Sequence, residues 1–292
     1  MIRVIQDLYQ YRRARFAFAL LAILAATAIF APLLAPMDPY EQHIDRRLEG
    51  SSSDFWLGTD YLGRCVMSRI VYGTRLSLRI AVLIVGIQVT TGVAFGAVAG
   101  YFGGVLDDLI MRSVDILMAL PSMALALVLA GVMGPGLMGI TLAMCITGWA
   151  EYARIVRGDI LAVREKEFVK SARAFGFSSF YILIRHVIPN VLAPVIVLAT
   201  LSTGFVIPVV AAFSFLGLGS QPPVADWGTM LSEGRAYMRL APHLTIFPGL
   251  AIMATTLAFN LLGDTLRDVI DPRFKLNPLT GNFYAVTRTA ES

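Results

Sequence analysis

The stretch EFVKSARAFGFSSFYILIRHVIPN, residues 167–190, is the longest charged helical stretch of a chain that is otherwise mostly apolar. Four of its side chains are charged, Glu167, Lys170, Arg173 and Arg185. Apolar residues recur at helical spacing on the other side, namely Phe168, Val169, Ala172 and Phe175. Such an amphipathic segment lies on a membrane surface or presents one face to a partner. Gly176 predicts a sharp turn within it, and Pro189 predicts the start of the next apolar segment.

The composition places the chain among membrane proteins. Of its 292 residues, 57% are hydrophobic and only 15% are charged, and the mean hydropathy is +0.69. A soluble domain of this size needs about 25% charged residues to cover its surface. The net charge of +4 comes without a basic stripe interleaved with aromatic residues. We therefore expect contact with membrane lipid and no nucleic-acid partner.

Long uncharged runs predict membrane-spanning helices. They cover residues 16–37, 80–106, 116–150, 186–225 and 240–263. The third run is too long for one crossing, and the tripeptide Gly134-Pro135-Gly136 breaks it into a tight helical hairpin. The first run exceeds the apolar core of a signal peptide and lacks a clear cleavage site, which predicts a retained anchor. The fold class is therefore an all-α polytopic membrane protein with six transmembrane helices, near residues 16–36, 77–100, 112–133, 137–158, 192–214 and 244–265.

Six crossings leave both termini on one side, and the distribution of Lys and Arg selects that side. Residues 1–15, the turn that ends at Arg112, residues 151–190 and the C-terminal tail hold most of the 24 basic residues. We therefore expect cytoplasmic N and C termini. The segments 37–79 and 215–243 are expected on the outer side.

Small residues in the second span predict close helix packing. Gly92, Gly96 and Gly100 recur at intervals of four, a spacing that lets helix backbones approach closely within a membrane. The two cysteines, Cys65 and Cys145, fall in a polar loop and in an apolar run. A disulfide between them is not expected, and each is interpreted as a small packed side chain.

The sequence lacks the motifs of a motor or an enzyme. It contains no P-loop, H-E-x-x-H or G-x-S-x-G motif, so we predict neither catalytic residues nor a metal site. His43, His186 and His243 are far apart in sequence and are interpreted as single polar contacts. Charges sit at the ends of the predicted spans, whereas ion-coupled carriers need ionisable residues at mid-membrane. The chain is therefore expected to be a conduit whose energy comes from a partner.

Residues 167–190 resemble the EAA loop of ABC importer permeases, whose pattern reads E-x-x-x-A-A-x-x-x-G-x(9)-I-x-L-P. The residues that match are Glu167, Ala172, Gly176 and Pro189. Ser171 replaces the first alanine of the pattern, and His186 replaces its isoleucine. The ending HVIPN is the form usual in the peptide and nickel branch of the family.

The resemblance covers about residues 30 to 275. Further blocks similar to that branch are FWLGTDYLGRCVMSRIVYGTRLSL (55–78), GYFGGVLDDLIMRSVDILMALPS (100–122), SFLGLGSQPPVADWG (214–228) and FNLLGDTLRDVIDPRF (259–274). They look like the shorter-loop permease subunit of dipeptide, oligopeptide and nickel systems. One departure is Cys65, where peptide permeases have Asp.

The resemblance implies a type I ABC importer transmembrane domain in a bacterial or archaeal inner membrane. Its coupling residues are expected to be Glu167, Ser171, Ala172, Gly176, His186 and Pro189. The implied partners are a homologous second permease, two ATPase subunits or domains, and a periplasmic or lipid-anchored solute-binding protein. The ATPases bind ATP and Mg, and this chain is expected to carry no cofactor of its own.

The expected organisation has three parts. Residues 1–75 form a cytoplasmic tail, the first helix and an outer loop; residues 76–275 form the permease core, with the EAA loop at 158–190; residues 276–292 form a cytoplasmic tail. The expected function is a permease subunit for a dipeptide or oligopeptide, and import of nickel or a nickel chelate remains open. An ion-coupled secondary carrier and a membrane-embedded enzyme are the other classes, and both lack support in the residues.

Overall fold

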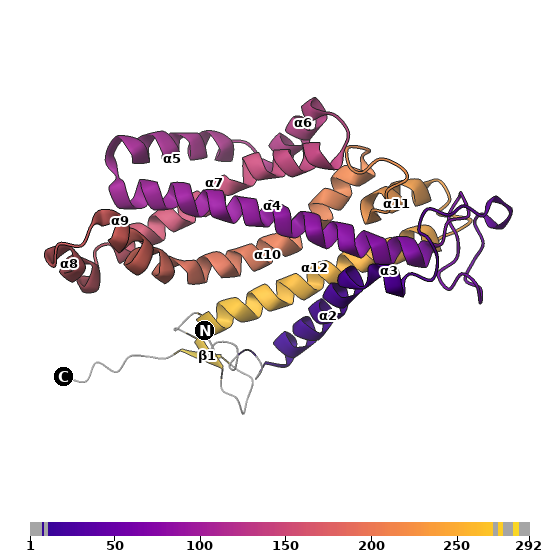
Figure 1. Ribbon diagram of the computed structural model, residues 1–292, viewed down its shortest axis with the longest axis horizontal. Coiled ribbons are helices and arrows are strands. Elements are labelled where there is room, and N and C mark those ends of the chain that lie inside the picture. Colours follow the sequence, from indigo (N-terminus) through magenta and orange to yellow (C-terminus); the bar gives the residue numbers. More distant parts are fainter. Residues whose placement is uncertain (1–7, 9–10, 271–273, 277–282, 286–292) are drawn as a thin grey trace.

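A computed structural model describes residues 8, 11–270, 274–276 and 283–285 of the chain. Its long helices run along the length of the molecule (Figure 1): α2 (Arg12–Ile29), α4 (Val66–Phe102), α7 (Leu137–Val163), α10 (Ile188–Phe215) and α12 (His243–Ile270). Shorter helices connect or flank them: α3 (Ala31–Leu34), the 3₁₀ turn η1 (Ile44–Arg46), α5 (Gly104–Met118), α6 (Ser122–Met133), α8 (Glu167–Ala174), α9 (Ser179–Ile182), the π-helix η2 (Leu183–Val187) and α11 (Trp227–Arg235).

A short antiparallel pair, β1 (Phe274–Leu276) and β2 (Phe283–Ala285), follows α12. Apart from this pair the described residues contain helices and loops only, so the all-α prediction is confirmed. The predicted tail 276–292 lies outside the described residues except for Leu276 and Phe283–Ala285.

The predicted count of six spans is not confirmed. In the described part of the chain three helices are long and apolar enough to cross a membrane: α4, the continuous helix Ser179–Phe215, and α12. The bent pair of α5 and α6 makes a fourth if its two helices form one broken span, and otherwise it is a re-entrant loop. α2 falls outside this set because its 18 residues include three arginines in the first turn. α7 falls outside it because charged residues from Glu151 onward lower the hydropathy of its second half.

The helix predicted near 112–133 is wrong as a single element. α5 begins at Gly104, and α5 and α6 meet at an angle of 87°. Pro121 stands at the break because it has no N–H to donate, and its ring disfavours a helical conformation for Leu120. The hairpin predicted at Gly134-Pro135-Gly136 is present, since α6 ends at Met133 and α7 begins at Leu137.

Two predicted boundaries also differ. α4 begins at Val66 rather than near residue 77, because its first turns carry arginines that an apolar-run criterion excludes but a helix accommodates. Pro189 does not start a new helix, because the chain is helical from Ser179 onward. The π-helix η2 makes this possible, because the Ile188 N–H donates to the Leu183 carbonyl, five residues back. The helix is therefore already wider at Pro189, which has no N–H to donate to the backbone hydrogen-bond ladder.

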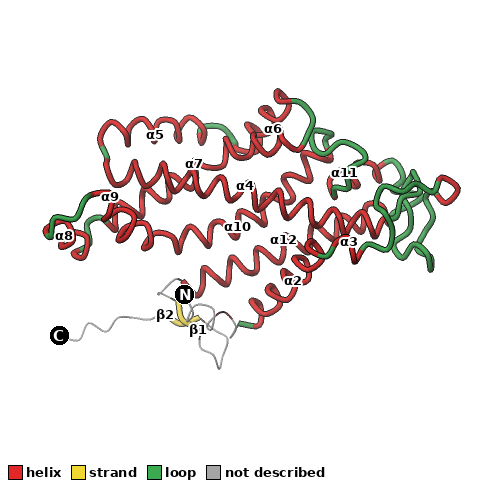
Figure 2. The backbone as a smooth tube through the Cα atoms, viewed as in Figure 1, coloured by secondary structure: helices red, strands yellow, loops and turns green. Residues whose placement is uncertain are grey.

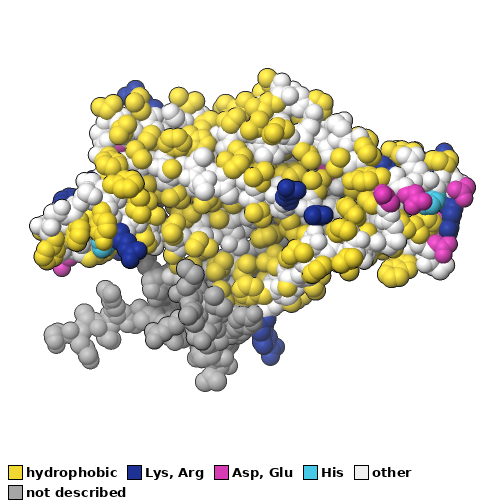
Figure 3. All heavy atoms as spheres, in the orientation of Figure 1, with side chains coloured by type: hydrophobic (Ala, Val, Ile, Leu, Met, Phe, Trp, Pro, Cys, Tyr) yellow, Lys and Arg dark blue, Asp and Glu magenta, His cyan; other side chains and the backbone are white. Residues whose placement is uncertain are grey.

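Loops gather at one end of the molecule, where the chain between α3 and α4 lies near α11 (Figure 2). The opposite end carries α8 and α9 (Figure 1). Hydrophobic side chains cover most of the visible face between the two ends, and most of its acidic side chains lie over the loop end (Figure 3). This distribution is typical of a helical bundle whose middle lies in lipid.

Of the three buried clusters among the described residues, two join most of the helices. The larger one joins α4, α6, α7, α10, α11 and α12, with Ile84, Ile140, Phe213 and Trp227 fully buried. The smaller one, which we call the α8-end cluster, joins the ends of α4, α7 and α10 to α8, α9 and η2; its members include Ala97, Tyr152, Ile160, Val169, Ala172, Ile182 and Val187. The α8 end is therefore packed into the bundle rather than attached as a free loop.

Candidate functional site

The segment from α8 through η2 is the first candidate site. α8 is amphipathic in the structure, as predicted: Val169 and Ala172 are buried in the α8-end cluster, while Glu167, Ser171 and Arg173 are exposed. The buried side chains of α8 thus belong to the same apolar cluster as side chains of α7, α9 and α10.

Gly176 forms the turn that ends α8. It has a φ of +82°, and its N–H donates to the Arg173 carbonyl at 3.0 Å. The N–H of Phe177 donates to the Ala172 carbonyl at 3.3 Å. This pair of bonds is the Schellman arrangement, in which a left-handed residue closes a helix. Ser178 then caps α9 by accepting from the Tyr181 N–H, so both helix ends are defined.

Aromatic side chains around the turn are exposed. Phe168 and Phe175, which the sequence pattern places on the apolar side, are 41% and 82% exposed. α8 has only eight residues and buries one narrow stripe, and Phe175 lies beyond it as the helix cap. Phe177 and Phe180 are exposed as well. An apolar patch flanked by charges is typical of a protein contact surface.

The remaining predicted coupling residues occupy different positions. Glu167 is exposed and has no hydrogen-bond or ion-pair partner among the described residues. His186 is half-buried in η2, and its ring meets Tyr181 edge-on at 5.7 Å. Tyr181 in turn stacks on Phe177 at 5.0 Å, so these rings connect η2 to the Gly176 turn. Pro189 is exposed in the first turn of α10.

The three glycines of the second span lie on the face of α4 that meets α7. A Cβ on Gly92 would lie 2.3 Å from the Tyr152 Cβ, and one on Gly96 would lie 2.6 Å from the Ala153 carbonyl oxygen. A Cβ on Gly100 would lie 3.0 Å from the Arg157 carbonyl oxygen. Any side chain at these positions would therefore force α4 and α7 apart.

A second candidate site is a pocket of about 340 Å³ at the break between α5 and α6. Apolar side chains form most of its wall, and the polar residues that line it are Gln88, Ser122, Thr147, Glu151, Tyr152 and Ser202. Sequence reasoning missed this site. Glu151 directly follows the uncharged run 116–150, and the structure places it midway along α7.

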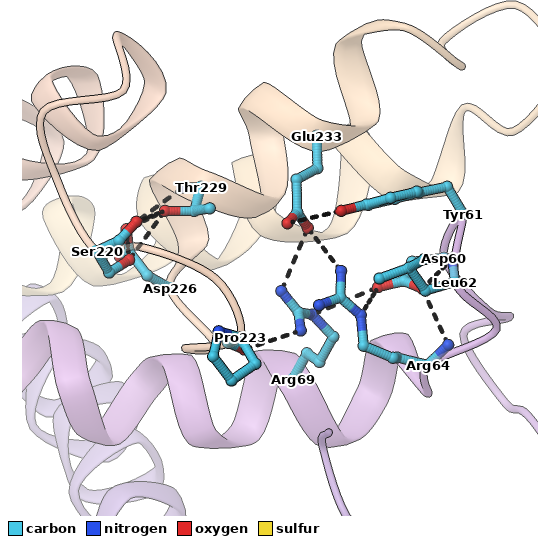
Figure 4. A network of polar contacts seen from close by, with 10 residues as sticks. All are labelled: Asp60, Tyr61, Leu62, Arg64, Arg69, Ser220, Pro223, Asp226, Thr229 and Glu233. Carbon is cyan, nitrogen blue, oxygen red and sulfur yellow. Dashed lines mark hydrogen bonds and ion pairs between the residues drawn. The ribbon is translucent and has the colours of Figure 1, made fainter. Parts of the chain in front are cut away.

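A buried ionic network occupies the loop end (Figure 4). Arg64 donates to Asp60 at 2.6 Å and to Glu233 at 2.9 Å, while Arg69 donates to Glu233 at 3.3 Å and to the Pro223 carbonyl at 3.4 Å. Both arginine side chains are only 1% exposed. Two cations and two anions thus join the loop before α4, α4 itself, the loop after α10, and α11.

Neighbouring groups extend this network. The Tyr61 hydroxyl donates to Glu233 at 3.2 Å, and burial together with the Glu233 charge raises the pKa of Tyr61. On the surface of the same loop, the Arg46 guanidinium holds the pKa of Glu49 below its usual value. The loop end is therefore a fixed platform. Its charged residues are visible in the sequence, but no local pattern shows that they are buried together.

No group of three or more His, Cys, Asp or Glu side chains in the described part of the chain could hold a metal ion. Cys65 and Cys145 are buried free thiols. The described geometry is that of a helical membrane bundle with one fixed loop end and one amphipathic helical end.

Comparison with known proteins identifies the family. Residues 92–276 match the binding-protein-dependent transport system inner membrane component, and residues 2–50 match the N-terminal TM domain of oligopeptide transport permease C. The chain belongs to the first of these families. It is thus a permease subunit of a binding-protein-dependent ABC importer, a multi-pass inner-membrane transport component rather than an enzyme, as the sequence predicted.

Similar proteins cover most of its length. A dipeptide transport system permease protein from Alkalihalophilus pseudofirmus is 43% identical over 85% of this chain and 82% of its own. A glutathione transport system permease protein from Pectobacterium atrosepticum is 43% identical over 87% and 84%. A dipeptide permease from Haemophilus influenzae is 38% identical over 91% and 92%. Membership of this family implies ATPase and solute-binding partners.

Proposed function

We propose that the chain forms half of a translocation pathway for a peptide-type solute, driven by separate ATPase subunits through α8 and α9. A homologous permease supplies the other half, and two ATPase subunits or domains bind ATP and Mg. The observation that carries this proposal is the α8 end: a defined turn presents exposed aromatic and charged residues, while its buried side belongs to the bundle core. Such a segment transmits force from a docked partner into the helices.

The solute class rests on the relatives. Those named above carry dipeptides or glutathione by their names, and both are short peptides. This favours a peptide over nickel or a nickel chelate.

We infer the orientation of the chain from the distribution of its basic residues. The α8 end and both termini are cytoplasmic, because basic residues concentrate in those segments. The loop end, fixed by the Asp60, Arg64, Arg69 and Glu233 network, faces outward and receives the solute-binding protein. A fixed platform suits this role because a pre-organised surface loses little entropy on binding.

Reconstitution tests the proposal. Liposomes with this chain, its companion permease, the ATPases and the loaded binding protein should accumulate a labelled dipeptide when ATP and Mg are present. Liposomes with this chain alone should accumulate none, since it has no P-loop. Active uptake by the chain alone, or full uptake without the ATPases, would contradict the proposal.

A further inference from the structure

The pocket at the break between α5 and α6 has the form of a ligand site. Its volume of about 340 Å³ lies at the lower end of the ~300–1,000 Å³ usual for small-molecule pockets. Its wall draws residues from α4, α5, α6, α7 and α10. A mostly apolar wall with a few convergent polar groups is the usual composition of such a site.

Tyr152 places an unused polar group at this pocket. The residue is 1% exposed and lines the pocket, and its buried hydroxyl has no hydrogen-bond partner among the described residues. Ser202 lies near that hydroxyl but not in hydrogen-bonding geometry with it. A buried hydroxyl left without a partner is unfavourable, and a polar group that reaches it from the pocket would remove this cost.

Glu151 places an unpaired negative charge beside Tyr152. Its carboxylate has no ion-pair or hydrogen-bond partner among the described residues. Its neighbours on α7 are paired: Arg154 with Asp115, and Arg157 with Asp107, where Nη2 donates to Oδ2 at 2.6 Å. An unpaired ionisable side chain in a membrane helix bundle is a candidate for solute contact.

The N-terminus of α6 supplies the opposite charge. Ser122 and Met123 line the pocket, and no side chain caps this 12-residue helix. The first helical bond joins the Leu125 N–H to the Pro121 carbonyl, so the preceding N–H groups have no acceptor among the described residues. Free N–H groups and the helix dipole favour a carboxylate at this position.

Gln88 is held so that it can accept a further hydrogen bond. Its Nε2 donates to the Met144 carbonyl at 2.8 Å. Gly148 makes room for this amide, because a Cβ there would lie 2.0 Å from Nε2. The Gln88 Oε1 is left without a partner among the described residues, in a residue that lines the pocket.

We propose that this pocket is a transit site for a short zwitterionic peptide. Glu151 binds the ammonium group, the α6 N-terminus binds the carboxylate, and Gln88 Oε1 and the Tyr152 hydroxyl hydrogen-bond the peptide group between them. The pairing of one anion with one helix N-terminus matches a solute whose two ends carry opposite charges. The proposal rests on the proposed function, since it takes the solute to be a peptide.

Photo-crosslinking during transport tests the site. The complete transporter in liposomes is supplied with a dipeptide that carries a diazirine side chain, loaded on the binding protein, and cross-linked peptides are identified by mass spectrometry. We expect adducts within residues 117–123 and 147–152. Glu151→Gln and Tyr152→Phe should each lower adduct yield and the maximal uptake rate at least fivefold, and Glu151→Asp should restore part of both.

Matched variants control for general damage. Tyr101→Phe removes another buried hydroxyl that has no partner in the described part of the chain, and Asp264→Asn removes another exposed carboxylate; both residues lie outside the pocket. Both should transport at the wild-type rate, and every variant should retain its ATPase in a pull-down. The wild type could import the dipeptide while the adducts form at other positions, or while adduct yield stays unchanged in Glu151→Gln and Tyr152→Phe. Either result refutes the transit site and leaves the proposed function standing. If the wild-type complex imports no peptide, the proposed function itself is refuted.

Discussion

Replacement of Gly176 by alanine should weaken ATPase docking through the backbone alone. Gly176 has a φ of +82°, and apart from its own residue and its two chain neighbours no described atom lies within 4 Å of the position of an added Cβ. Alanine therefore causes no clash, and the expected penalty is the about 1–2 kcal/mol that a left-handed conformation costs a residue with a Cβ. We expect the free loop of the variant to relieve this strain by changing the conformation of the turn. Docking of the ATPase must then restore the left-handed turn, so the penalty lowers the affinity.

That penalty corresponds to about a 5–30-fold loss of affinity for the ATPase. Gly176→Asn should lose less, because asparagine tolerates this conformation better than alanine. Gly176→Asp should abolish uptake, because it adds a carboxylate to the contact surface, while membrane insertion and pairing with the second permease are retained. Glu167→Ala should be milder, since Glu167 is exposed and has no partner among the described residues.

The assay is titration of the ATPase onto permease complexes in nanodiscs, with uptake measured in the same membranes. Gly158→Ala is the matched control, because Gly158 lies within α7 with open space around it and without a positive φ. It should bind the ATPase as the wild type does. Wild-type affinity and uptake in Gly176→Asp would refute the view that this turn is the coupling element.

Two further predictions concern the ends of the molecule. A cysteine at Ser52 should react with a membrane-impermeant thiol reagent in cells with a permeabilised outer membrane, and one at Ser178 should not; the reverse pattern would overturn the orientation. Glu233→Ala leaves the buried Arg64 and Arg69 with Asp60 as their remaining carboxylate, so it should destabilise the loop end by about 3–5 kcal/mol. Glu49→Ala removes partly exposed contacts with Arg46 and Ser52 and should change the thermal midpoint little. Equal shifts of the midpoint for the two variants would show that the buried network contributes no more stability than a surface ion pair.

Much of this protein was predictable from local sequence because the relevant physics is local. Apolar run length determines where a helix can meet lipid, and this located the cores of α4, α10 and α12. Gly176 was predictable as a turn because a left-handed helix end favours glycine. Gly92, Gly96 and Gly100 were predictable as a packing face because their spacing repeats with the helix. The resemblance to ABC importer permeases was also visible in the sequence, because it lies in short contiguous blocks such as residues 167–190.

Tertiary structure decided which polar groups meet. Arg64 and Glu233 are 169 positions apart, and nothing near either residue in the sequence indicates that they pair. Glu151 follows an uncharged run like any charge at the edge of a span, and only the packing of α4, α5, α6, α7 and α10 forms the pocket that this exposed side chain lines. The continuous helix through η2 also escaped prediction, because a proline is compatible with a helix once the preceding turn widens. Local propensity specifies the helices, but the pairing of charges depends on which helices pack together, and that is a property of the whole bundle.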